Sequence, residues 1–373
     1  MPSILPTNQN AEDKSVLKKL PLPQPDRELY DSVFKAGFDA YPERLKNYKI
    51  YQKSNRREVL DYLPIKLDIE NVSRCNFRCT MCQVSEWPKQ QRAVDMHFED
   101  YQKLLEEQHG LVEVKIQGMG EPLLGGDTYF KMIELARQRH LWVRSVTNGS
   151  LLHLKENYKR LIDSDVCEMH VSIDGATKET YDKVRIPVAK RLYQTNRLED
   201  LENNILRFMK LRSELKRELP LVRLSFLAIN ENKEEIQEFV NKWTGIVDTV
   251  EIQKNIAPSF EMNTKNEKEN IEDWYKTLGE EMNTENRITD HLKKYSCREP
   301  WSQMSIYSDG SILPCCATFG RNIPIGSIHN ETVKEAWNGL KIKRIRDGFK
   351  KNKPHKVCRA CLDHTTTVTN DIL

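Results

Sequence analysis

The sequence predicts an α/β protein built around a partial (β/α)6 barrel, with a helical extension before it and a small C-terminal domain after it. Short apolar runs alternate with amphipathic helical patterns through the middle of the chain, which is typical of repeated βα units with a parallel sheet. Polar and glycine-containing turns follow several of these runs, where the carboxyl ends of parallel strands place ligand-binding residues. The 373 residues are enough for about two domains.

Six βα units are expected in order. The apolar runs predict strands at 65–70, 111–117, 142–147, 166–174, 222–229 and 249–253. Helical periodicity predicts helices at 98–108, 127–139 and 154–164, a long helical stretch to about residue 217, and a helix at 234–243.

Four segments follow from these patterns. Residues 1–64 form an N-terminal extension, with a proline-rich leader to about residue 25 and a helical pattern at 26–62, which we interpret as a packing or lid segment. Residues 65–255 form the barrel. Residues 256–290 are polar and predict a helical linker, and residues 291–373 form a second cysteine-rich domain.

Composition excludes some classes of function. The 58 Lys and Arg residues nearly balance the 55 Asp and Glu residues, and the net charge of +3 is spread along the chain, which argues against a nucleic-acid surface. No run of about 18 apolar residues or secretion signal is present, so a cytoplasmic protein without a membrane segment is expected.

Three cysteines, Cys75, Cys79 and Cys82, follow the first predicted strand with C-x3-C-x2-C spacing. Cysteines this close in a reducing compartment bind metal or carry out chemistry more often than they form disulfides. A structural zinc site takes four ligands, whereas a cubane iron–sulfur cluster held by three cysteines leaves one iron open for another ligand. A zinc-binding knuckle remains the alternative for this loop alone.

This loop resembles the signature of the radical S-adenosylmethionine (radical SAM) enzymes. The resemblance implies a 4Fe–4S cluster whose open iron chelates S-adenosylmethionine (SAM), and reductive cleavage of SAM to a 5′-deoxyadenosyl radical that removes a hydrogen atom from a substrate. Turns at three later strand ends are similar to the family's SAM-binding motifs: Gly-Met-Gly-Glu-Pro at 118–122, with Met119 as an extra residue, Thr-Asn-Gly at 147–149, and Ser-Ile-Asp-Gly at 172–175 with a following arginine. The residues that the resemblance assigns to SAM are Met81, Gly118, Gly120, Glu121, Asn148, Ser172 and Arg185. By composition alone, plain βα turns and a solvent-facing arginine remain alternatives.

A second cysteine group lies near the C-terminus. Cys297, Cys315, Cys358 and Cys361 provide four thiolates, enough for one complete cubane, and a hairpin is predicted at Asp309 and Gly310. The order of these residues resembles the twitch form of the SPASM domain, which implies one auxiliary 4Fe–4S cluster. A four-cysteine zinc ribbon is the alternative. Cys316 and Cys167 are given no ligand role.

These motifs indicate a reaction type, because the cofactors carry the chemistry and the pocket selects the substrate. The expected function is a radical SAM oxidoreductase that oxidises an alcohol of a small carbohydrate-like molecule, a sugar or an aminocyclitol, with electron transfer to the auxiliary 4Fe–4S cluster. A flavodoxin- or ferredoxin-type reductant is expected to supply the electron that cleaves SAM. The alternatives are a radical epimerase, a peptide- or protein-modifying enzyme that docks its substrate on the N-terminal extension, and a metal-stabilised binding module. Neither residue spacing nor resemblance identifies a general base, the substrate or the oligomeric state.

Overall fold

A computed structural model describes residues 27–82, 85, 94–189, 197–254, 295–315, 323–359 and 361–362. Three sequence expectations lie outside these residues: the proline-rich leader, the helical linker at 256–290, and any role of Cys316. Within the described residues, no helix is long and apolar enough to cross a membrane.

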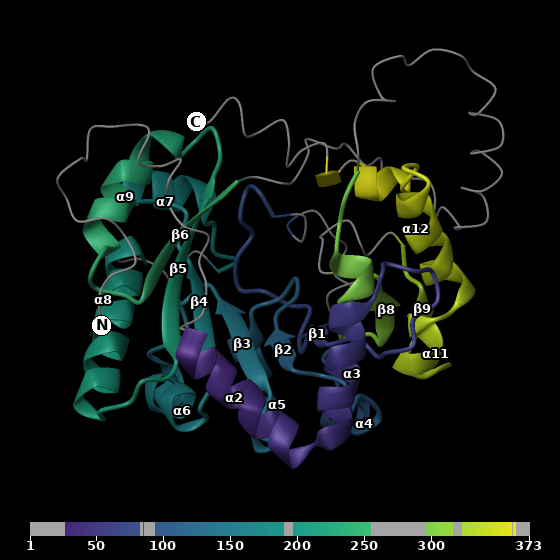
Figure 1. Ribbon diagram of the computed structural model, residues 1–373. Coiled ribbons are helices and arrows are strands. Elements are labelled where there is room, and N and C mark those ends of the chain that lie inside the picture. The colour runs from purple at the N-terminus through teal and green to yellow at the C-terminus, as the bar shows by residue number, and fades with distance from the viewer. Residues whose placement is uncertain are drawn as a thin grey trace, which may run out of the picture.

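The described strands form one sheet in the order β6-β5-β4-β3-β2-β1-β7-β8-β9 (Figure 1). Strands β1 to β6 are parallel to their neighbours, which confirms the predicted α/β class. Predicted and observed bounds agree closely, and β3 begins and ends where the sequence predicts. The strands are β1 Lys66–Ile69, β2 Glu113–Ile116, β3 Trp142–Thr147, β4 Glu168–Ser172, β5 Leu221–Ala228, β6 Thr249–Lys254, β7 Gln303–Ile306, β8 Ser311–Leu313 and β9 Gly326–Ser327.

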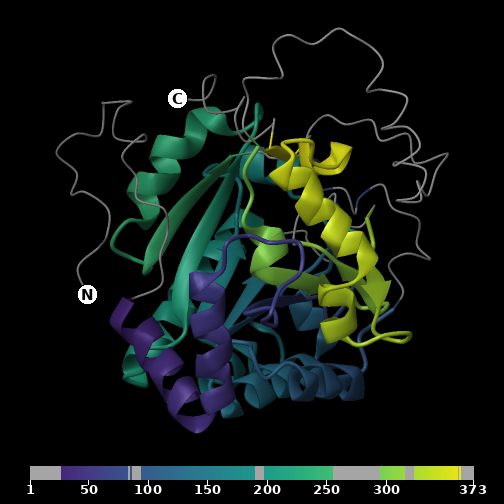
Figure 2. The same cartoon turned by 45° about the vertical axis from the view of Figure 1, so that its right-hand side comes forward.

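Helices between the strands cover one face of the sheet (Figures 1 and 2). They are α4 Phe98–Glu107, α5 Asp127–Gln138, α6 Asn157–Asp163, α7 Lys178–Val184, α8 Arg197–Glu214 and α9 Ile236–Trp243, with short 3-10 turns at η3 Pro122–Gly125, η4 Leu154–Glu156 and η6 Lys233–Glu235. The helical stretch predicted after β4 is therefore divided into α7 and α8 in the described residues. A further helix pair, α11 Val333–Trp337 and α12 Leu340–Lys350, follows the hairpin strands.

Alternation along the strands separates an apolar outer face from a polar inner face. Leu67 and Val114 are fully buried against the helices. Their neighbours Asp68 and Lys115 point to the opposite face because successive strand residues alternate, and the register pairs these two directly. The inner face of the barrel is therefore charged.

The helical part of the N-terminal extension closes the amino ends of the strands. Helices α2 Arg27–Ala40 and α3 Pro42–Lys53 lie beneath the sheet in both ribbon views (Figures 1 and 2). Phe34 on α2 packs in a cluster with Trp142, Cys167 and Leu221, residues at the starts of β3, β4 and β5. The extension thus forms a plug at the end of the barrel opposite the carboxyl ends of the strands, so the described helices are not a lid over that end.

The helical pattern predicted to residue 62 is too long. Helix α3 ends at Lys53, and 54–62 contain no helix. The backbone carbonyl of Arg57 accepts a hydrogen bond from the Trp301 indole at 2.8 Å, and that of Tyr62 accepts one from the Trp337 indole at 2.7 Å. Since both carbonyls bond to the C-terminal domain, residues 54–62 join the N-terminal extension to that domain, and we call this segment the clasp.

The C-terminal domain continues the barrel sheet. Strand β7 is parallel to β1, with Asp68 opposite Ser305, and β8 returns antiparallel to β7. The predicted hairpin is confirmed: Gly310 has a φ of +81°, which glycine adopts without a steric penalty, and its N–H donates to the Tyr307 carbonyl at 2.9 Å. The second cysteine group is consequently beside the barrel.

Candidate active site

The cysteine loop leaves the carboxyl end of β1 and rests on the segment after α7. The backbone N–H of Arg78 donates to the Ile186 carbonyl at 2.6 Å, and that of Thr80 donates to the Val184 carbonyl at 3.0 Å. The Arg78 guanidinium also donates to the loop's own Cys75 carbonyl at 2.9 Å. These bonds fix the backbone of the loop around Cys75 and Cys79.

Two of the loop sulfurs have donors directed at them. Cys75 Sγ accepts from the Phe77 N–H at 3.4 Å and lies 4.0 Å from Asn148 Nδ2, while Cys79 Sγ lies 3.7 Å from Arg185 Nη1. Burial raises the pKa of the Cys75 thiol to about 12. Because metal coordination deprotonates a thiol that burial would otherwise keep neutral, these sulfurs suit metal ligation.

The turn after β2 packs against the start of the cysteine loop. A Cβ on Gly120 would lie 2.1 Å from the Val72 carbonyl oxygen, and one on Gly118 would lie 2.3 Å from Glu70 Cγ. The Met119 N–H donates to Glu70 Oε2 at 2.7 Å. Both glycines are thus required by the packing of the protein itself, in addition to any approach of a ligand.

Glu121 joins two of the predicted SAM-binding turns. Its carboxylate, which is 2% exposed, accepts from Thr147 Oγ1 at 2.6 Å and from the Asn148 N–H at 2.7 Å. Burial raises the pKa of Glu121 in spite of these donors. The structure therefore brings Glu121, Asn148 and Cys75 together around one point at the carboxyl ends of β1 to β3.

The turn after β4 supplies the opposite wall. Asp174 accepts from the Leu227 N–H at 2.7 Å and forms an ion pair with Arg185, which is the residue beside Cys79. Ser172 is half-buried at the end of β4, and Met81 is half-buried next to Cys82. Thus Arg185 is not a solvent-facing side chain, and the four turns converge on the cysteine loop.

The second cysteine group is split between the hairpin and the end of the chain. Cys297 precedes η8 Glu299–Trp301, Cys315 follows β8, and Cys358 and Cys361 follow α12. Burial raises the pKa of Cys358 to about 12, and the thiols of Cys297 and Cys361 contribute to the rise because they are close. Three of the four predicted ligands are therefore near one another.

Comparison with known proteins identifies this arrangement. A sequence model described as "Radical SAM superfamily" matches residues 71–242, and one described as "Iron-sulfur cluster-binding domain", SPASM, matches residues 297–362. The chain belongs to the radical SAM superfamily. It is a radical SAM enzyme with a C-terminal SPASM domain, and both the recognition of the family and the fold class are confirmed.

The matched relatives carry out different reactions. The tungsten-containing aldehyde ferredoxin oxidoreductase cofactor-modifying protein of Pyrococcus furiosus is 23% identical over 52% of this chain and 51% of its own. The mycofactocin maturase MftC of Mycobacterium ulcerans is 29% identical over 33% of this chain and 32% of its own. GTP 3′,8-cyclase of Campylobacter lari is 30% identical over 39% and 42%. Each match spans about half or less of the curated relative.

Solved structures support the fold. Streptococcus suis SuiB bound to S-adenosylmethionine has a TM-score of 0.56 and 16% identity, covering 89% of this chain and 76% of SuiB. The anSMEcpe structure with bound AdoMet has a TM-score of 0.52 and 18% identity, covering 83% and 99%. At these identities the likeness concerns the fold alone.

The cofactors of this radical SAM enzyme are SAM and 4Fe–4S clusters, the auxiliary cluster belonging to the SPASM domain. Among the described residues, no three His, Cys, Asp or Glu side chains already surround a single metal ion. A cubane presents a different iron to each cysteine, so its thiolates need not converge on one point. The buried thiols and their donors fit such a group.

A charged ladder crosses the inner face of the barrel, and the sequence interpretation did not foresee it. Glu168, which is 2% exposed, lies 3.1 Å from Arg144 and 2.5 Å from Arg223. Arg144 also lies 3.4 Å from Glu113, and Arg223 lies 3.7 Å from Glu251. The sequence does contain a signal for this ladder. Charged residues two positions apart within one predicted strand, such as Lys66 and Asp68 or Glu113 and Lys115, share a face and so predict a charged inner face.

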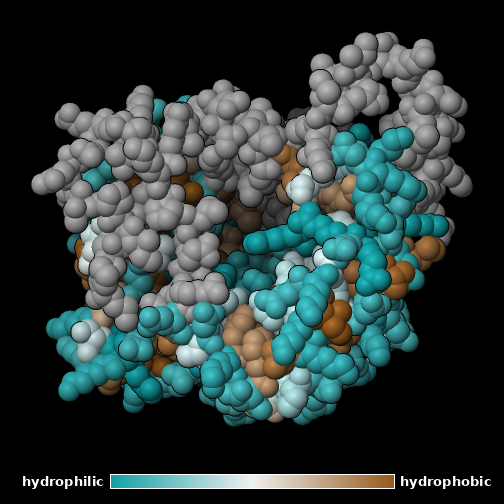
Figure 3. Space-filling view, in the orientation of Figure 1, coloured by the Kyte–Doolittle hydropathy of each residue, from teal (hydrophilic) through white to brown (hydrophobic). Residues whose placement is uncertain are grey.

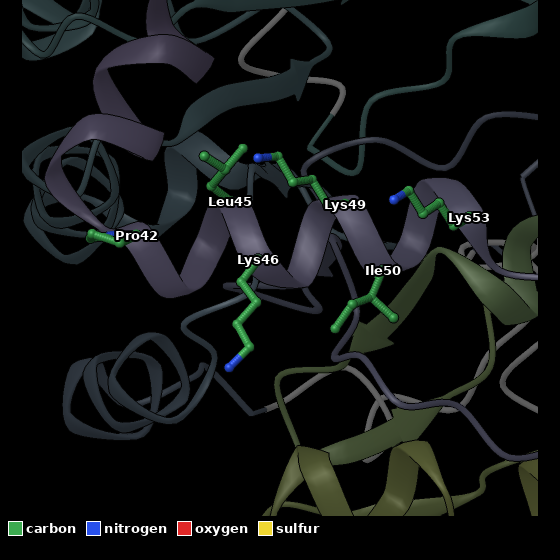
Figure 4. A pocket seen from close by; sticks show the side chains of 6 residues that line it. All are labelled: Pro42, Leu45, Lys46, Lys49, Ile50 and Lys53. Atoms are coloured by element: carbon green, nitrogen blue, oxygen red, sulfur yellow. The ribbon is translucent and has the colours of Figure 1, made fainter.

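A surface hollow on α3 lies away from these groups (Figure 4). Its lining contains no carboxylate, thiol or imidazole and consists of Pro42, Leu45, Lys46, Lys49, Ile50 and Lys53. It belongs to the plug and offers no group for radical chemistry. By contrast, the face shown in Figure 3 is hollowed at its centre, with hydrophilic residues at the border of the hollow.

Proposed function

We propose that this radical SAM enzyme is a dehydrogenase that oxidises an alcohol group of a small polyhydroxyl substrate, a sugar or an aminocyclitol. The substrate would lie on the polar inner face of the barrel. Cys75, Cys79 and Cys82 would hold the SAM-binding cluster, and Cys297, Cys315, Cys358 and Cys361 the auxiliary cluster. When bound, these groups supply a 5′-deoxyadenosyl radical on one side and a one-electron acceptor on the other.

The observation that carries this proposal is the pairing of β7 with β1. Strand β1 leads into the cysteine loop, and β7 follows Cys297 by six positions in the chain. Burial raises the pKa of Glu299, and the nearby carboxylate of Asp68, on the inner face of β1, contributes to the rise. Glu299 in turn contributes to the raised pKa of Cys361, after burial. Asp68 thus lies opposite Ser305 of β7 and near Glu299, two positions after Cys297, so the inner face adjoins the auxiliary cysteine group, where a substrate radical would lose its second electron.

The residues of this chain would position SAM and exclude water. Glu121 would hold the turns after β2 and β3 together, and Arg185 would fix the loop through Cys79 while its remaining donors face the cofactor. Gly118, Gly120, Asn148, Ser172 and Met81 would line the SAM site with them. The electron that cleaves SAM would come from a flavodoxin- or ferredoxin-type reductant in the cytoplasm.

A peptide substrate is the second candidate, favoured by two comparisons. MftC is a maturase, and SuiB has been solved bound to the precursor peptide SuiA with a TM-score of 0.56 to this chain. The described part of the N-terminal extension gives this reading no docking strand, because α2 and α3 pack against the amino ends of the barrel strands.

Epimerisation would use Cys316 or Cys167 as its hydrogen-atom donor; Cys316 lies outside the described residues, and the position of Cys167 gives this reading little support. The donor must lie near the substrate, and Cys167 is fully buried in the plug cluster, where its sulfur accepts from the Val143 N–H at 3.3 Å. Since Cys167 lies at the amino end of β4, it is remote from the turns that converge on the cysteine loop.

Anaerobic reconstitution with a substrate panel tests the proposal. The reduced enzyme is incubated with SAM and either unphosphorylated sugars and cyclitols or a peptide library, and 5′-deoxyadenosine and oxidised products are measured by mass spectrometry. We expect a polyol to give a product two hydrogens lighter, together with 5′-deoxyadenosine. Turnover with peptides alone would select the maturase reading instead.

A further inference from the structure

Outside the charged ladder, polar side chains without hydrogen-bond partners among the described residues lie on the inner face of β2 and β7, the two strands that flank β1. Within the ladder, Glu113, Arg144, Glu168, Arg223 and Glu251 are ion-paired with one another. Their charges are therefore compensated by the protein.

Lys115, Asp68 and Ser305 continue the ladder as a row across β2, β1 and β7, because the register pairs Lys115 with Arg144 of the ladder. The register places Asp68 directly opposite Lys115 on one side and Ser305 on the other, so all three side chains share the inner face. We call these three residues the inner row. It passes from the barrel proper into the C-terminal domain.

Two members of the inner row, Ser305 and Lys115, lack a hydrogen-bond partner in the part of the chain that the structure describes. Ser305 is 2% exposed, and its hydroxyl oxygen has no partner. The neighbouring Gln303, also on the inner face, has an unpartnered Nε2 at 7% exposure. Buried polar groups are almost always hydrogen-bonded, so unsatisfied ones gathered on one face point to a polar ligand. The half-buried Lys115 ammonium makes no hydrogen bond or ion pair with any described residue.

Asp68 lies between Lys115 and Ser305 in the register. Its carboxylate, which is 7% exposed, accepts one hydrogen bond from Gln117 Nε2 at 2.8 Å. Gln117 directly precedes the glycine turn of the SAM site, so Asp68 is one residue contact from that turn. Burial raises the pKa of Asp68, which makes its carboxylate a better proton acceptor.

We propose that the inner row holds the reacting alcohol of an unphosphorylated polyhydroxyl ring, with Asp68 accepting the proton of that alcohol. Lys115 and Ser305 would bind the adjacent hydroxyls and orient the ring. This inference rests on the proposed dehydrogenase function and assigns it the base and the substrate class.

The charge of the row selects the substrate class. Lys115 lies opposite Asp68 in the register, and Lys66 lies 3.1 Å from Glu113, so each of these two lysines has a carboxylate as its neighbour, and these residues offer a phosphate no excess of positive charge. Glu299 adds a second acidic group near Asp68. A neutral or aminated ring suits this environment, because its hydroxyl and amino groups donate to a carboxylate and accept from an ammonium.

The step balances as an oxidation by two electrons. The carbinol C–H bond would break by loss of a hydrogen atom to the radical that bound SAM supplies. Asp68 would take the O–H proton as the C–O bond becomes a carbonyl double bond, and the auxiliary cluster held by the SPASM cysteines would supply the acceptor for the second electron. Product release and return of the proton to solvent would restore the carboxylate.

Binding without turnover tests the row independently of the reaction. The reconstituted enzyme with SAM, but without reductant, is dialysed to equilibrium against radiolabelled myo-inositol, glucosamine or myo-inositol 1-phosphate. Asp68→Asn, Lys115→Met and Ser305→Ala are compared with the wild type. Asp163→Asn on α6 and Lys131→Met on α5 are matched controls, since both positions are exposed on outer helices. Iron content and circular dichroism confirm that each variant is folded and loaded.

We expect the wild type and both controls to bind an unphosphorylated probe more tightly than the phosphate ester. We expect Asp68→Asn to weaken that binding by about tenfold or more, as for loss of a hydrogen bond to a charged group. Three outcomes would overturn the proposal that the inner row binds the substrate. They are equal binding by wild type and Asp68→Asn, tighter binding of the phosphate ester, and no binding of either unphosphorylated probe by the wild type.

Turnover separates the two proposals. If the wild type binds the ring through the row but yields no oxidised product, the row stands as a binding site and the dehydrogenase function fails. If Asp68→Asn oxidises saturating probe at the wild-type rate, the role of Asp68 as proton acceptor is refuted.

Discussion

Replacing Glu168 with glutamine tests whether the charged ladder stabilises the barrel. Glu168 lies on β4 at the centre of the ladder, where its carboxylate contacts Arg144, Arg223 and the imidazole of His170 at 3.0 Å. Glutamine keeps the shape of the side chain and removes its charge. The two arginines then remain buried with less compensation.

The magnitude follows from the pKa of Glu168. Burial by itself would raise it, but the hydrogen bond with His170 and the positive charges of Arg144 and Arg223 outweigh burial and lower the pKa from 4.5 to about 2. This shift corresponds to about 3 kcal/mol of folding free energy at neutral pH. Breaking a buried ion pair costs about 3–5 kcal/mol in general, which agrees.

The pH dependence has a defined sign. Because the folded-state pKa is depressed, the stabilisation is fully present above the unfolded value of 4.5 and is lost as the pH falls toward about 2. The stabilisation contributed by the Glu168 carboxylate should therefore decline between pH 7 and pH 3.

Urea unfolding followed by circular dichroism measures both quantities, with both proteins prepared in the same cluster-free state. Glu134→Gln, at an exposed position on α5, is the control and should match the wild type at both pH values. A Glu168→Gln protein within about 0.5 kcal/mol of the wild type at pH 7 would refute the reasoning, since surface substitutions have effects of that size. A difference that stays constant with pH would show that lost packing, and not charge, is responsible.

Three further predictions concern the other parts of the chain. Alanine at Cys75, Cys79 and Cys82 together should lower the iron count from about eight to about four per chain and abolish 5′-deoxyadenosine formation, because one of two cubanes is lost. Iron and sulfide analysis together with a product assay measures both effects. Zinc in place of the remaining iron would contradict the prediction. Phe34→Ala should cost about 3 kcal/mol in urea unfolding, because the ring is 8% exposed and lies 4.3 Å from that of Tyr30 in the plug; an unchanged midpoint would show that the plug is not needed for stability. Arg346→Met should cost about 2–4 kcal/mol, since the guanidinium donates at 2.9 Å to the carbonyls of residues 300 and 58; limited proteolysis should then release the C-terminal domain, and resistance equal to that of the wild type would argue against the clasp.

Much of the barrel could be predicted because its signals are local. The apolar run of β3 and the turn residues after it are read within a few positions, and the predicted bounds of that strand are those observed. The hairpin at Gly310 was likewise predictable, because a turn with a positive φ favours glycine whatever surrounds it.

Contacts between distant parts of the chain could not be predicted in this way. The helical pattern before residue 62 overran its true end because the carbonyls of Arg57 and Tyr62 bond to Trp301 and Trp337, more than two hundred positions later. Glu121 was predicted to face SAM, but only the fold shows that its carboxylate ties Thr147 and Asn148 to the turn after β2.

The sequence by itself determined the family and the cofactors, because cysteine spacing on a short loop is enough to specify a three-thiolate cluster site. Only the tertiary structure decided what faces that site. Asp68, Lys115 and Ser305 are ordinary residues in isolation, and they become one row because β7 pairs with β1 and strand register aligns side chains that lie far apart in the chain.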